Sequence, residues 1–400
     1  MMELAGAIVF LPREGNGRSL MLEDLLFDPA ALWLAEALRR AGVERFLVVC
    51  HRDDQEEASA CFPEGTEFIT TGTDDANQRL GAFLHGREGR VAVVTRPVQL
   101  LGEEAKALLS GEVYDAAEDW ESGVCRIDAA ALAAALEEGM DFERALTARA
   151  DRLTSRGVWF PHAHPIRAGW RLRAECELRA RNDAAARLME EGVRIVDPNS
   201  VYVGPRVTVG AGSVLLPGTI LRGRTAIGGA CEIGPNTMIR DCTIGERCTV
   251  NASQLNESTV DAGTKVGPFA YVRPNCHVGR DVKVGDFVEL KNSTIGDGTK
   301  ISHLTYVGDS DVGGHVNFGC GTVTVNYDGI TKYRTTIGDN AFIGCNTNLV
   351  APVKIGDGAY TAAGSTITDD VPGDSLAIAR SVQVVKKQWA AKRRSRKKPS

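Results

Sequence analysis

Residues 203–240 read VGPRVTVGAGSVLLPGTILRGRTAIGGACEIGPNTMIR, and this stretch decides the fold of the carboxy-terminal half. A small apolar residue returns at every sixth position, and glycine often follows it. Neither a helix, which repeats about every 3.6 residues, nor an alternating strand produces a six-residue period over such a length. The apolar positions are Val203, Val209, Leu215, Leu221, Ile227, Ile233 and Ile239.

The same period continues along the chain with slips of single residues. Each six residues then form one flat side of a triangular coil, in which the apolar residue points inward and a small residue permits the corner. Three sides make a coil of about eighteen residues, so residues 200–375 predict about ten coils of a parallel β-helix. A β-sandwich, the alternative, requires turns at longer and less regular intervals. The later inward positions are Ile244, Val250, Val260, Val266, Val272, Val278, Val284, Ile295, Ile301, Val312, Phe318, Ile337, Ile343, Leu349, Ile355, Thr361 and Ile367.

One segment, residues 326–336 (NYDGITKYRTT), interrupts the repeat. Insertions in a repeat protein form loops on one face, and that face is often the binding face. We therefore expect this loop to contribute to a ligand site.

The first 150 residues follow a different pattern, in which apolar strands alternate with helices. This alternation predicts a Rossmann-like α/β domain, with a parallel sheet and helices on its faces. The expected elements are strands at 5–11, 45–50, 67–71 and 90–95 and helices at 29–42 and 75–86.

Between the two patterns, residues 175–191 are strong helix formers, and Gly192 supplies a helix C-cap. The predicted domains are an α/β domain at 1–150, a linker at 151–195 that contains this helix, the β-helix at 196–380 and a basic tail at 381–400.

The composition is that of a soluble globular chain, with 24% charged and 43% hydrophobic residues among 400. No apolar run is long enough to cross a membrane, and no basic region precedes the first apolar run. These features predict a cytoplasmic protein. Ten cysteines occur without a CxxC pair, which favours buried thiols over a metal site.

Charge is distributed unevenly. Residues 386–398 carry eight basic residues and no acidic one, although the whole chain has a net charge of −6. A solvated tail is the simplest interpretation. Nucleic-acid binding is disfavoured because the rest of the chain is acidic, and attraction of a phosphorylated cofactor is a third reading.

Several strings outside the repeat itself carry a family resemblance. Together they resemble the acetyltransferase domain of the bifunctional N-acetylglucosamine-1-phosphate uridyltransferase/glucosamine-1-phosphate N-acetyltransferase family, over residues 175–388. The resemblance implies a left-handed coil, a homotrimer and transfer of acetyl from acetyl-CoA to the 2-amino group of glucosamine 1-phosphate, with no metal in that step. The strings are GPFAYVRP (267–274), GDFVELKNS (285–293), KISHLTYVGD (300–309), VNFGCGTVTVNYDGITKYRT (316–335) and SLAIAR (375–380).

The resemblance also implies roles for individual residues. His303 is the expected base that frees the amine. The cations expected to bind the sugar phosphate are Arg273, Lys291 and Lys332. The residues expected to orient the sugar are Tyr306, Asn317 and Asn326. The residues expected along the acetyl-CoA path are Cys320, through its backbone N–H, with Tyr327, Cys345, Ala363 and Arg380.

Two positions depart from the family pattern. The family usually has alanine where Cys320 stands and serine where Cys345 stands. A covalent acyl-enzyme is one reading of a cysteine here. No activating base is evident, so we interpret both as substitutions that tune coenzyme A affinity and expose the enzyme to thiol reagents.

The amino-terminal half resembles the family's uridyltransferase domain in arrangement but not in chemistry. Where the family has a small, glycine-rich phosphate loop, residues 11–22 read LPREGNGRSLML, with Gly15 and Gly17 retained. Pro12 removes a backbone donor, and Glu14 places negative charge where triphosphate would lie.

Two further departures point the same way. Arg96 stands where the family has a metal-binding aspartate, and a cation cannot ligate magnesium. The string ESGVCRIDAAAL (121–132) resembles a later family segment but comes early, as if a substrate-binding stretch were deleted. We expect uridyltransferase activity to be lost.

Other readings stay open. One alternative is a bifunctional enzyme that also makes UDP-N-acetylglucosamine. A second is an N-acetyltransferase that acts on another amino sugar, and a third is a sugar-phosphate sensor without catalysis. The set of Arg273, Lys291, Tyr306 and Lys332 disfavours another acceptor, and His303 disfavours a sensor, because a binder has no need of a base.

Overall fold

The computed structural model describes residues 4–13, 17–87, 89–110, 123–149 and 164–395. The chain divides into two compact units, and the boundary between them in the sequence lies between Glu246 and Arg247. This boundary falls inside the hexapeptide repeat, so the domain limits expected from the sequence stay predictions.

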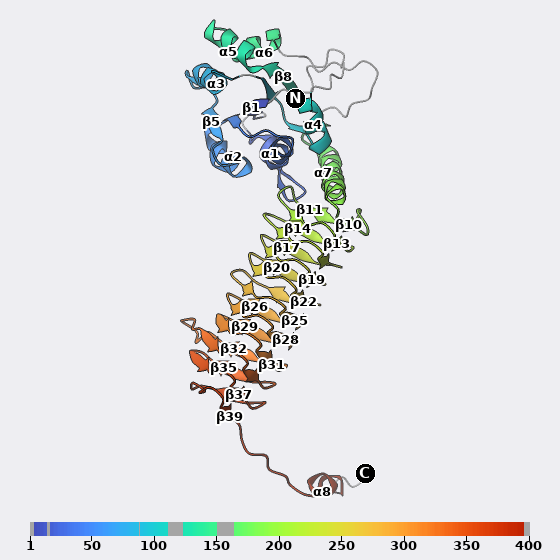
Figure 1. Cartoon of the computed structure of the whole chain (residues 1–400), viewed down its shortest axis with the longest axis vertical. Helices are drawn as coiled ribbons and strands as arrows, with labels where there is room; N and C mark the ends of the chain where they lie inside the picture. The colour runs from blue at the N-terminus through green and yellow to red at the C-terminus, as the bar shows by residue number, and fades with distance from the viewer. Residues whose placement is uncertain (1–3, 14–16, 88, 111–122, 150–163, 396–400) are drawn as a thin grey trace. The chain divides into compact units, whose positions relative to one another are not determined.

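The first unit opens with a five-stranded sheet of order β5-β4-β1-β6-β8, of which Figure 1 labels β1, β5 and β8. β1, β4, β5 and β6 run parallel, and β8 pairs antiparallel with β6. The strands are β1 (Leu4–Leu11), β4 (Phe46–Cys50), β5 (Glu67–Thr70), β6 (Arg90–Val94) and β8 (Val124–Asp128), with the short pairs β2 (Asp24–Leu25) and β3 (Asp28–Pro29), and β7 (Val98–Gln99) and β9 (His164–Pro165).

Helices cover this sheet because its central strands are apolar along their whole length. A buried core joins the sheet to α3, α5 and α6, and α1 contacts α2 and α4. The helices are α1 (Ala30–Arg40), α2 (Gln55–Cys61), α3 (Ala76–Leu84), α4 (Gly102–Ser110), α5 (Ala129–Glu137) and α6 (Phe142–Arg149).

All six elements expected in this domain are present within a few residues of their expected limits. The four expected strands are parallel, as predicted, and the sheet has in addition an antiparallel edge strand, β8, that was not expected. Several elements were not predicted, including α2 and α4 to α6. Their segments are short and rich in alanine and glutamate, so they carry little apolar periodicity.

Helix α7 (Trp170–Glu190) follows, and it begins five residues before the expected start. Residues 170–174 are themselves good helix formers, and Gly169 precedes them at φ 129°. The expected end is confirmed, because Gly192 adopts φ 89° and the N–H of Val193 bonds to the Leu188 carbonyl.

The parallel β-helix then begins, as expected. In the first unit its strands form three faces, with β10-β13-β16, β11-β14-β17 and β12-β15-β18 as neighbours within each. They are β10 (Arg194–Ile195), β11 (Tyr202–Val203), β12 (Thr208–Val209), β13 (Val214–Leu215), β14 (Ile220–Arg222), β15 (Ala226–Ile227), β16 (Glu232–Ile233), β17 (Met238–Arg240) and β18 (Thr243–Ile244).

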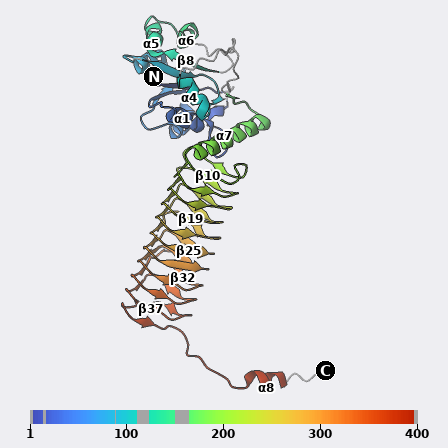
Figure 2. The same cartoon turned by 45° about the vertical axis from the view of Figure 1, so that its right-hand side comes forward.

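The second unit has the same three faces, whose strands stack in parallel (Figures 1 and 2). The first face contains β19 (Thr249–Val250), β22 (Lys265–Val266), β25 (Lys283–Asp286), β28 (Lys300–His303), β31 (Asn317–Phe318), β34 (Phe342–Ile343), β37 (Tyr360–Thr361) and β39 (Leu376–Ala377). The second face contains β20 (Gln254–Asn256), β23 (Tyr271–Val272), β26 (Glu289–Lys291), β29 (Tyr306–Gly308), β32 (Val323–Val325), β35 (Asn348–Val350) and β38 (Thr366–Ile367). The third face contains β21 (Thr259–Val260), β24 (His277–Val278), β27 (Thr294–Ile295), β30 (Ser310–Val312), β33 (Thr335–Ile337) and β36 (Val353–Ile355), and a short helix α8 (Trp389–Ser395) follows the coils.

Every inward position expected from the six-residue period is buried. The structure adds inward residues that were not among the expected positions. Leu290 and Val307 keep the six-residue period from Val284 and Ile301, and Leu255 comes five residues after Val250 because of a single-residue slip. Thr324 is also inward and fully buried, and it donates to the Gly308 carbonyl and accepts from the Gly308 N–H. A hydroxyl satisfied in this way can replace an apolar side chain in the coil.

Candidate active site

The predicted base lies at the corner that joins the first face to the second. His303 ends β28, and its register partner in β25 is Asp286. The Nδ1 atom of His303 lies 2.6 Å from Oδ1 of Asp286, and the two side chains are 57% and 40% exposed, so a substrate can reach them. The hydrogen bond from His303 lowers the pKa of Asp286. An ionised carboxylate only accepts, so Nδ1 carries the proton and Nε2 keeps a free lone pair.

The same corner carries three of the residues expected along the acetyl-CoA path. Ile301 pairs with Phe318, Phe318 with Ile343, and Ile343 with Thr361. These four paired residues are each followed, two positions later, by a residue at the corner. The corner residues, in order, are His303, Cys320, Cys345 and Ala363. We call this row, headed by Asp286, the corner column.

Backbone hydrogen bonds hold the column together. Asn346 N–H donates to the Cys320 carbonyl and Gly364 N–H to the Cys345 carbonyl, both at 2.8 Å. Cys320, Cys345 and Ala363 are all exposed. Arg380 reaches the end of the column, because a Cβ on Gly364 would lie 3.7 Å from Arg380 Cδ. The base and four of the five residues expected for acetyl-CoA therefore lie along one edge.

The coils approach so closely at this corner that glycine is needed. A Cβ on Gly319 would lie 2.4 Å from the backbone nitrogen of Cys345. The glycine of the GCG string thus permits the coils to stack, and it sets Cys320 directly beside Cys345.

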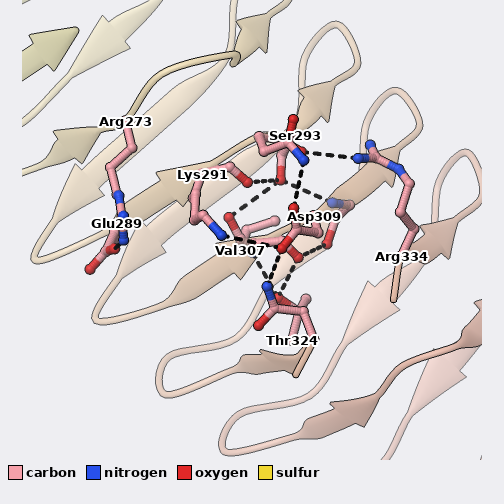
Figure 3. Close-up of polar contacts among 12 residues, drawn as sticks. Arg273, Glu289, Lys291, Ser293, Val307, Asp309, Thr324 and Arg334 are labelled. Carbon is pink, nitrogen blue, oxygen red and sulfur yellow. Dashed lines mark hydrogen bonds and ion pairs between the residues drawn. The ribbon is translucent and has the colours of Figure 1, made fainter. Parts of the chain in front are cut away.

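A second group of expected residues lies on and beside the second face. Arg273 follows β23 and pairs with Glu289 at 2.9 Å, and Lys291 ends β26, 3.5 Å from Asp309 (Figure 3). The hydrogen bond to Glu289 raises the pKa of Arg273. Together with Lys332, these four residues form what we call the cationic cluster.

Asp309 is the buried centre of this cluster. It accepts hydrogen bonds from the side-chain amides of Asn292, at 2.5 Å, and Asn326, and it faces Lys291 (Figure 3). Burial favours a raised pKa for Asp309, but the hydrogen bonds from Asn292 and Asn326 and the charge of Lys291 outweigh burial and lower it. Asp309 thus stays ionised and fixes the positions of Lys291 and Asn326.

Lys332 comes from the loop that interrupts the repeat, and it lies against Lys291. The neighbouring amino group of Lys291 lowers the pKa of Lys332, as expected for two like charges placed together. Three cations in this cluster share two carboxylates, so one positive charge is uncompensated. Such an excess suits a bound phosphate dianion, whose charge would relieve the repulsion between the lysines.

Three further predicted residues lie at separate places. Tyr306 is on β29, and its ring lies over Gly308, where a Cβ would sit 2.3 Å from the phenol oxygen. Asn317 is on β31, on the first face. Tyr327 lies in the loop, where it bridges to Lys332 through the backbone and its hydroxyl donates to the Gly329 carbonyl at 2.6 Å.

Asp286 and Asp309, which stand inside the strings GDFVELKNS and KISHLTYVGD, were not among the residues expected at the site. A signal was available, because Asp286 precedes His303 by 17 residues and Lys291 precedes Asp309 by 18. A search for acids one coil away from each predicted cation or base would have found both.

The carboxyl edge of the amino-terminal sheet has a different arrangement. Pro12 and Arg13 follow β1, and Arg13 binds the buried Asp54, which follows β4, through two hydrogen bonds of 2.8 and 2.7 Å. These bonds lower the pKa of Asp54. Arg96 follows β6 and is exposed. Glu14 and Gly15 lie outside the described residues.

In the part of the chain that the structure describes, no group of three or more His, Cys, Asp or Glu side chains is arranged to hold a metal ion. None of the described helices is long and apolar enough to span a membrane.

A family model described as bacterial transferase hexapeptide (six repeats) matches residues 334–369. The chain is 52% identical over 220 residues to a Bifunctional protein GlmU from Clostridium kluyveri, covering 55% of this chain and 48% of that protein. It is 54% identical over 207 residues to a Bifunctional protein GlmU from Acetivibrio thermocellus, covering 52% and 45%. Among solved structures, an Arabidopsis UDP-N-acetylglucosamine acyltransferase matches at 16% identity and a TM-score of 0.29, over 47% of this chain and 66% of that one.

The chain therefore carries the hexapeptide repeat of bacterial transferases at residues 334–369, and its predicted fold class, with a left-handed parallel β-helix, is confirmed. Over the matched residues, it is similar to bifunctional GlmU proteins. The chain spans about half the length of the curated relatives it matches.

Proposed function

We propose that this chain is a cytoplasmic glucosamine-1-phosphate N-acetyltransferase, which uses acetyl-CoA as co-substrate and supplies N-acetylglucosamine 1-phosphate for UDP-N-acetylglucosamine and cell-wall precursors. The observation that carries the proposal is the corner column, in which His303 stands in line with Cys320, Cys345 and Ala363. A base at the head of a narrow row of small side chains suits a thioester that lies along that row.

The mechanism follows from the hydrogen bond to Asp286. The neutral substrate amine attacks the thioester carbonyl, and Nε2 of His303 accepts the proton that its nitrogen loses as the C–N bond forms, while Asp286 stabilises the resulting imidazolium. The backbone N–H of Cys320 donates to the oxygen of the tetrahedral intermediate. When the intermediate collapses, the C–S bond breaks, and the imidazolium returns a proton to the coenzyme A thiolate. The step needs no metal.

The cationic cluster is the proposed site of the sugar phosphate. Arg273, Lys291 and Lys332 bind the phosphate, and Asp309 keeps Lys291 and Asn326 in place. The sugar hydroxyls and the amine are oriented by Tyr306, Asn317 and Asn326. Asn317 lies on a different face from the cluster, which supports a site completed between chains of a homotrimer.

Coenzyme A takes the other part of the site. Its thioester lies beside Cys320 and Cys345, and its remaining length passes Ala363, Tyr327 and Arg380. The guanidinium of Arg380, at the end of the column, suits the phosphates of coenzyme A.

We further propose that uridyltransferase activity is lost. In open α/β sheets, ligands bind outside the carboxyl ends of the parallel strands. Here the Arg13–Asp54 ion pair spans β1 and β4 at that edge. Pro12 offers no N–H to a triphosphate, and Arg96 offers no ligand to magnesium.

The test of the acetyltransferase is coenzyme A release in the presence of glucosamine 1-phosphate. His303→Ala should lower kcat by about 10²- to 10⁴-fold, because the amine then loses its general base. His277→Ala is the matched control, since His277 is also an exposed histidine paired with an aspartate, Asp261, at 2.8 Å on the third face. It should leave kcat unchanged.

Two results would contradict the proposal. Folded wild-type protein that releases no coenzyme A would exclude this acceptor and direct the search to other amino sugars. Equal kcat values for His303→Ala and wild type would exclude His303 as the base.

A further inference from the structure

The two cysteines that depart from the family pattern are register neighbours in the corner column. Phe318 pairs with Ile343, so Cys320 and Cys345 are each two residues beyond a paired position, and Asn346 N–H binds the Cys320 carbonyl at 2.8 Å. Neighbouring strands lie about 4.8 Å apart. Disulfides form across Cα separations of about 4.4–6.8 Å, and the Cα spacing expected for paired strands falls in that range.

These two thiols are also the reactive ones of the chain. Cys320 and Cys345 are exposed, whereas the other eight cysteines are buried or half-buried. Burial raises the pKa of Cys50 and Cys61 to about 11 and that of Cys125 to about 12. Because the thiolate is the nucleophile, an oxidant meets one accessible pair and a set of inert thiols.

We propose that Cys320 and Cys345 form a reversible disulfide between adjacent coils, which switches off acetyl-CoA use. The oxidant is a low-molecular-weight disulfide such as oxidised glutathione. One cysteine thiolate attacks a sulfur of the small disulfide, forms a mixed disulfide and releases one small thiolate. The second cysteine thiolate then attacks the first cysteine's sulfur, so the protein disulfide forms and the second small thiolate leaves. The two cysteines lose two electrons and two protons, and one small disulfide becomes two thiols.

The consequence for activity rests on the proposed function. A disulfide here lies where the thioester is expected, directly after His303 in the column. It also closes the segment between residues 320 and 345, which contains the loop that carries Lys332. Oxidation therefore constrains both the coenzyme A path and one cation of the sugar-phosphate site.

The experiment uses the full chain, treated with oxidised glutathione and then with a maleimide that labels free thiols. We expect a loss of two labelled thiols per chain, a linked Cys320–Cys345 peptide in a non-reducing digest, and recovery of both thiols with dithiothreitol. The variant Cys320→Ala should give no linked peptide. Two thiols that stay free, or glutathione adducts without a linked peptide, would overturn the proposal.

A second measurement compares acetyltransferase rates of the oxidised and reduced protein. The wild type should lose at least about tenfold on oxidation, the loss expected when a disulfide occupies the thioester's place. Cys320→Ala should have a ratio near one, whatever its basal rate. A linked pair with an unchanged rate would overturn the switch. If the reduced protein is inactive on glucosamine 1-phosphate, the proposed function fails, while the linked peptide still decides whether the disulfide forms.

Discussion

The amino-terminal sheet and the β-helix both place cations at an exposed edge, but they treat the charge in opposite ways. At the sheet edge, the buried carboxylate of Asp54 holds Arg13 through two hydrogen bonds. On the β-helix, Lys291 and Lys332 lie against each other, and three cations share two carboxylates.

This difference teaches how a ligand site can be told from a degenerate one in a single chain. A site for a phosphorylated substrate must keep positive charge available. Its like charges therefore repel one another until the anionic ligand binds and relieves the repulsion. An edge that binds no ligand is stabilised when its charges neutralise one another. The contrast is local, so variants of single residues can test it.

The largest expected effect is the complete absence of uridyltransferase activity at the sheet edge. We expect no pyrophosphate release from UTP and N-acetylglucosamine 1-phosphate with magnesium, because Arg13 is neutralised and Arg96 cannot hold the metal. A bifunctional GlmU relative assayed in parallel is the positive control. Turnover of UTP by this chain would break the comparison, since it would mean that a neutralised edge still binds a triphosphate.

The next contrast concerns the uncompensated charge of the β-helix. Lys332→Met should raise the KM for glucosamine 1-phosphate by about 10- to 100-fold, the range for loss of a charge-assisted hydrogen bond, with a smaller effect on kcat. Lys265→Met, an exposed lysine on the first face, is the matched control and should leave the KM unchanged. Initial rates across substrate concentrations separate the two parameters. An unchanged KM for Lys332→Met would show that the cationic cluster does not bind the sugar phosphate.

The sequence predicted the β-helix far better than it predicted the contacts within the site. A six-residue period fixes which residues point inward, and all the expected positions are buried because each coil repeats the same local geometry. The partners of His303 and Lys291 depend instead on which residues meet across coils. The coil above His303 is shifted by one residue, since Asp286 is 17 residues away. A slip of this kind shifts the apolar period by only one residue, but it changes which polar side chains meet across the coils.

In the α/β domain, the local sequence pattern predicted the strands but not how the strands pair or which polar residues meet at their ends. Its apolar strands were predictable, but the antiparallel pairing of β8 and the Arg13–Asp54 pair were not. Arg13 and Asp54 are 41 residues apart, and only the parallel pairing of β1 with β4 brings the ends of those strands together. Polar contacts between strand ends are fixed by sheet topology, which the local pattern of residues does not contain.

The smallest expected effect tests whether the ion pair at the sheet edge contributes to folding. Asp54→Asn should lower the free energy of unfolding of the first unit by about 1 kcal/mol at pH 7, because the amide oxygen still accepts one hydrogen bond while the charge-assisted part is lost. The helix signal of circular dichroism during urea unfolding follows this unit, since α1 to α7 lie within it. Asp53→Asn is the matched control. Asp53 is exposed and lies 3.6 Å from Arg13, so its loss should have a smaller effect.

The pH dependence of the free energy of unfolding provides an independent check of the same prediction. The folded-state pKa of Asp54 is lowered, so its contribution is present above the unfolded-state value of about 3.9 and is lost as the pH falls through the lower folded-state value. The stability difference between wild type and Asp54→Asn should therefore shrink below pH 4. A difference that stays constant down to pH 2 would mean that Asp54 acts by packing and not by its charge. The sheet edge would then be closed by its shape, and the contrast in charge with the β-helix would no longer explain it.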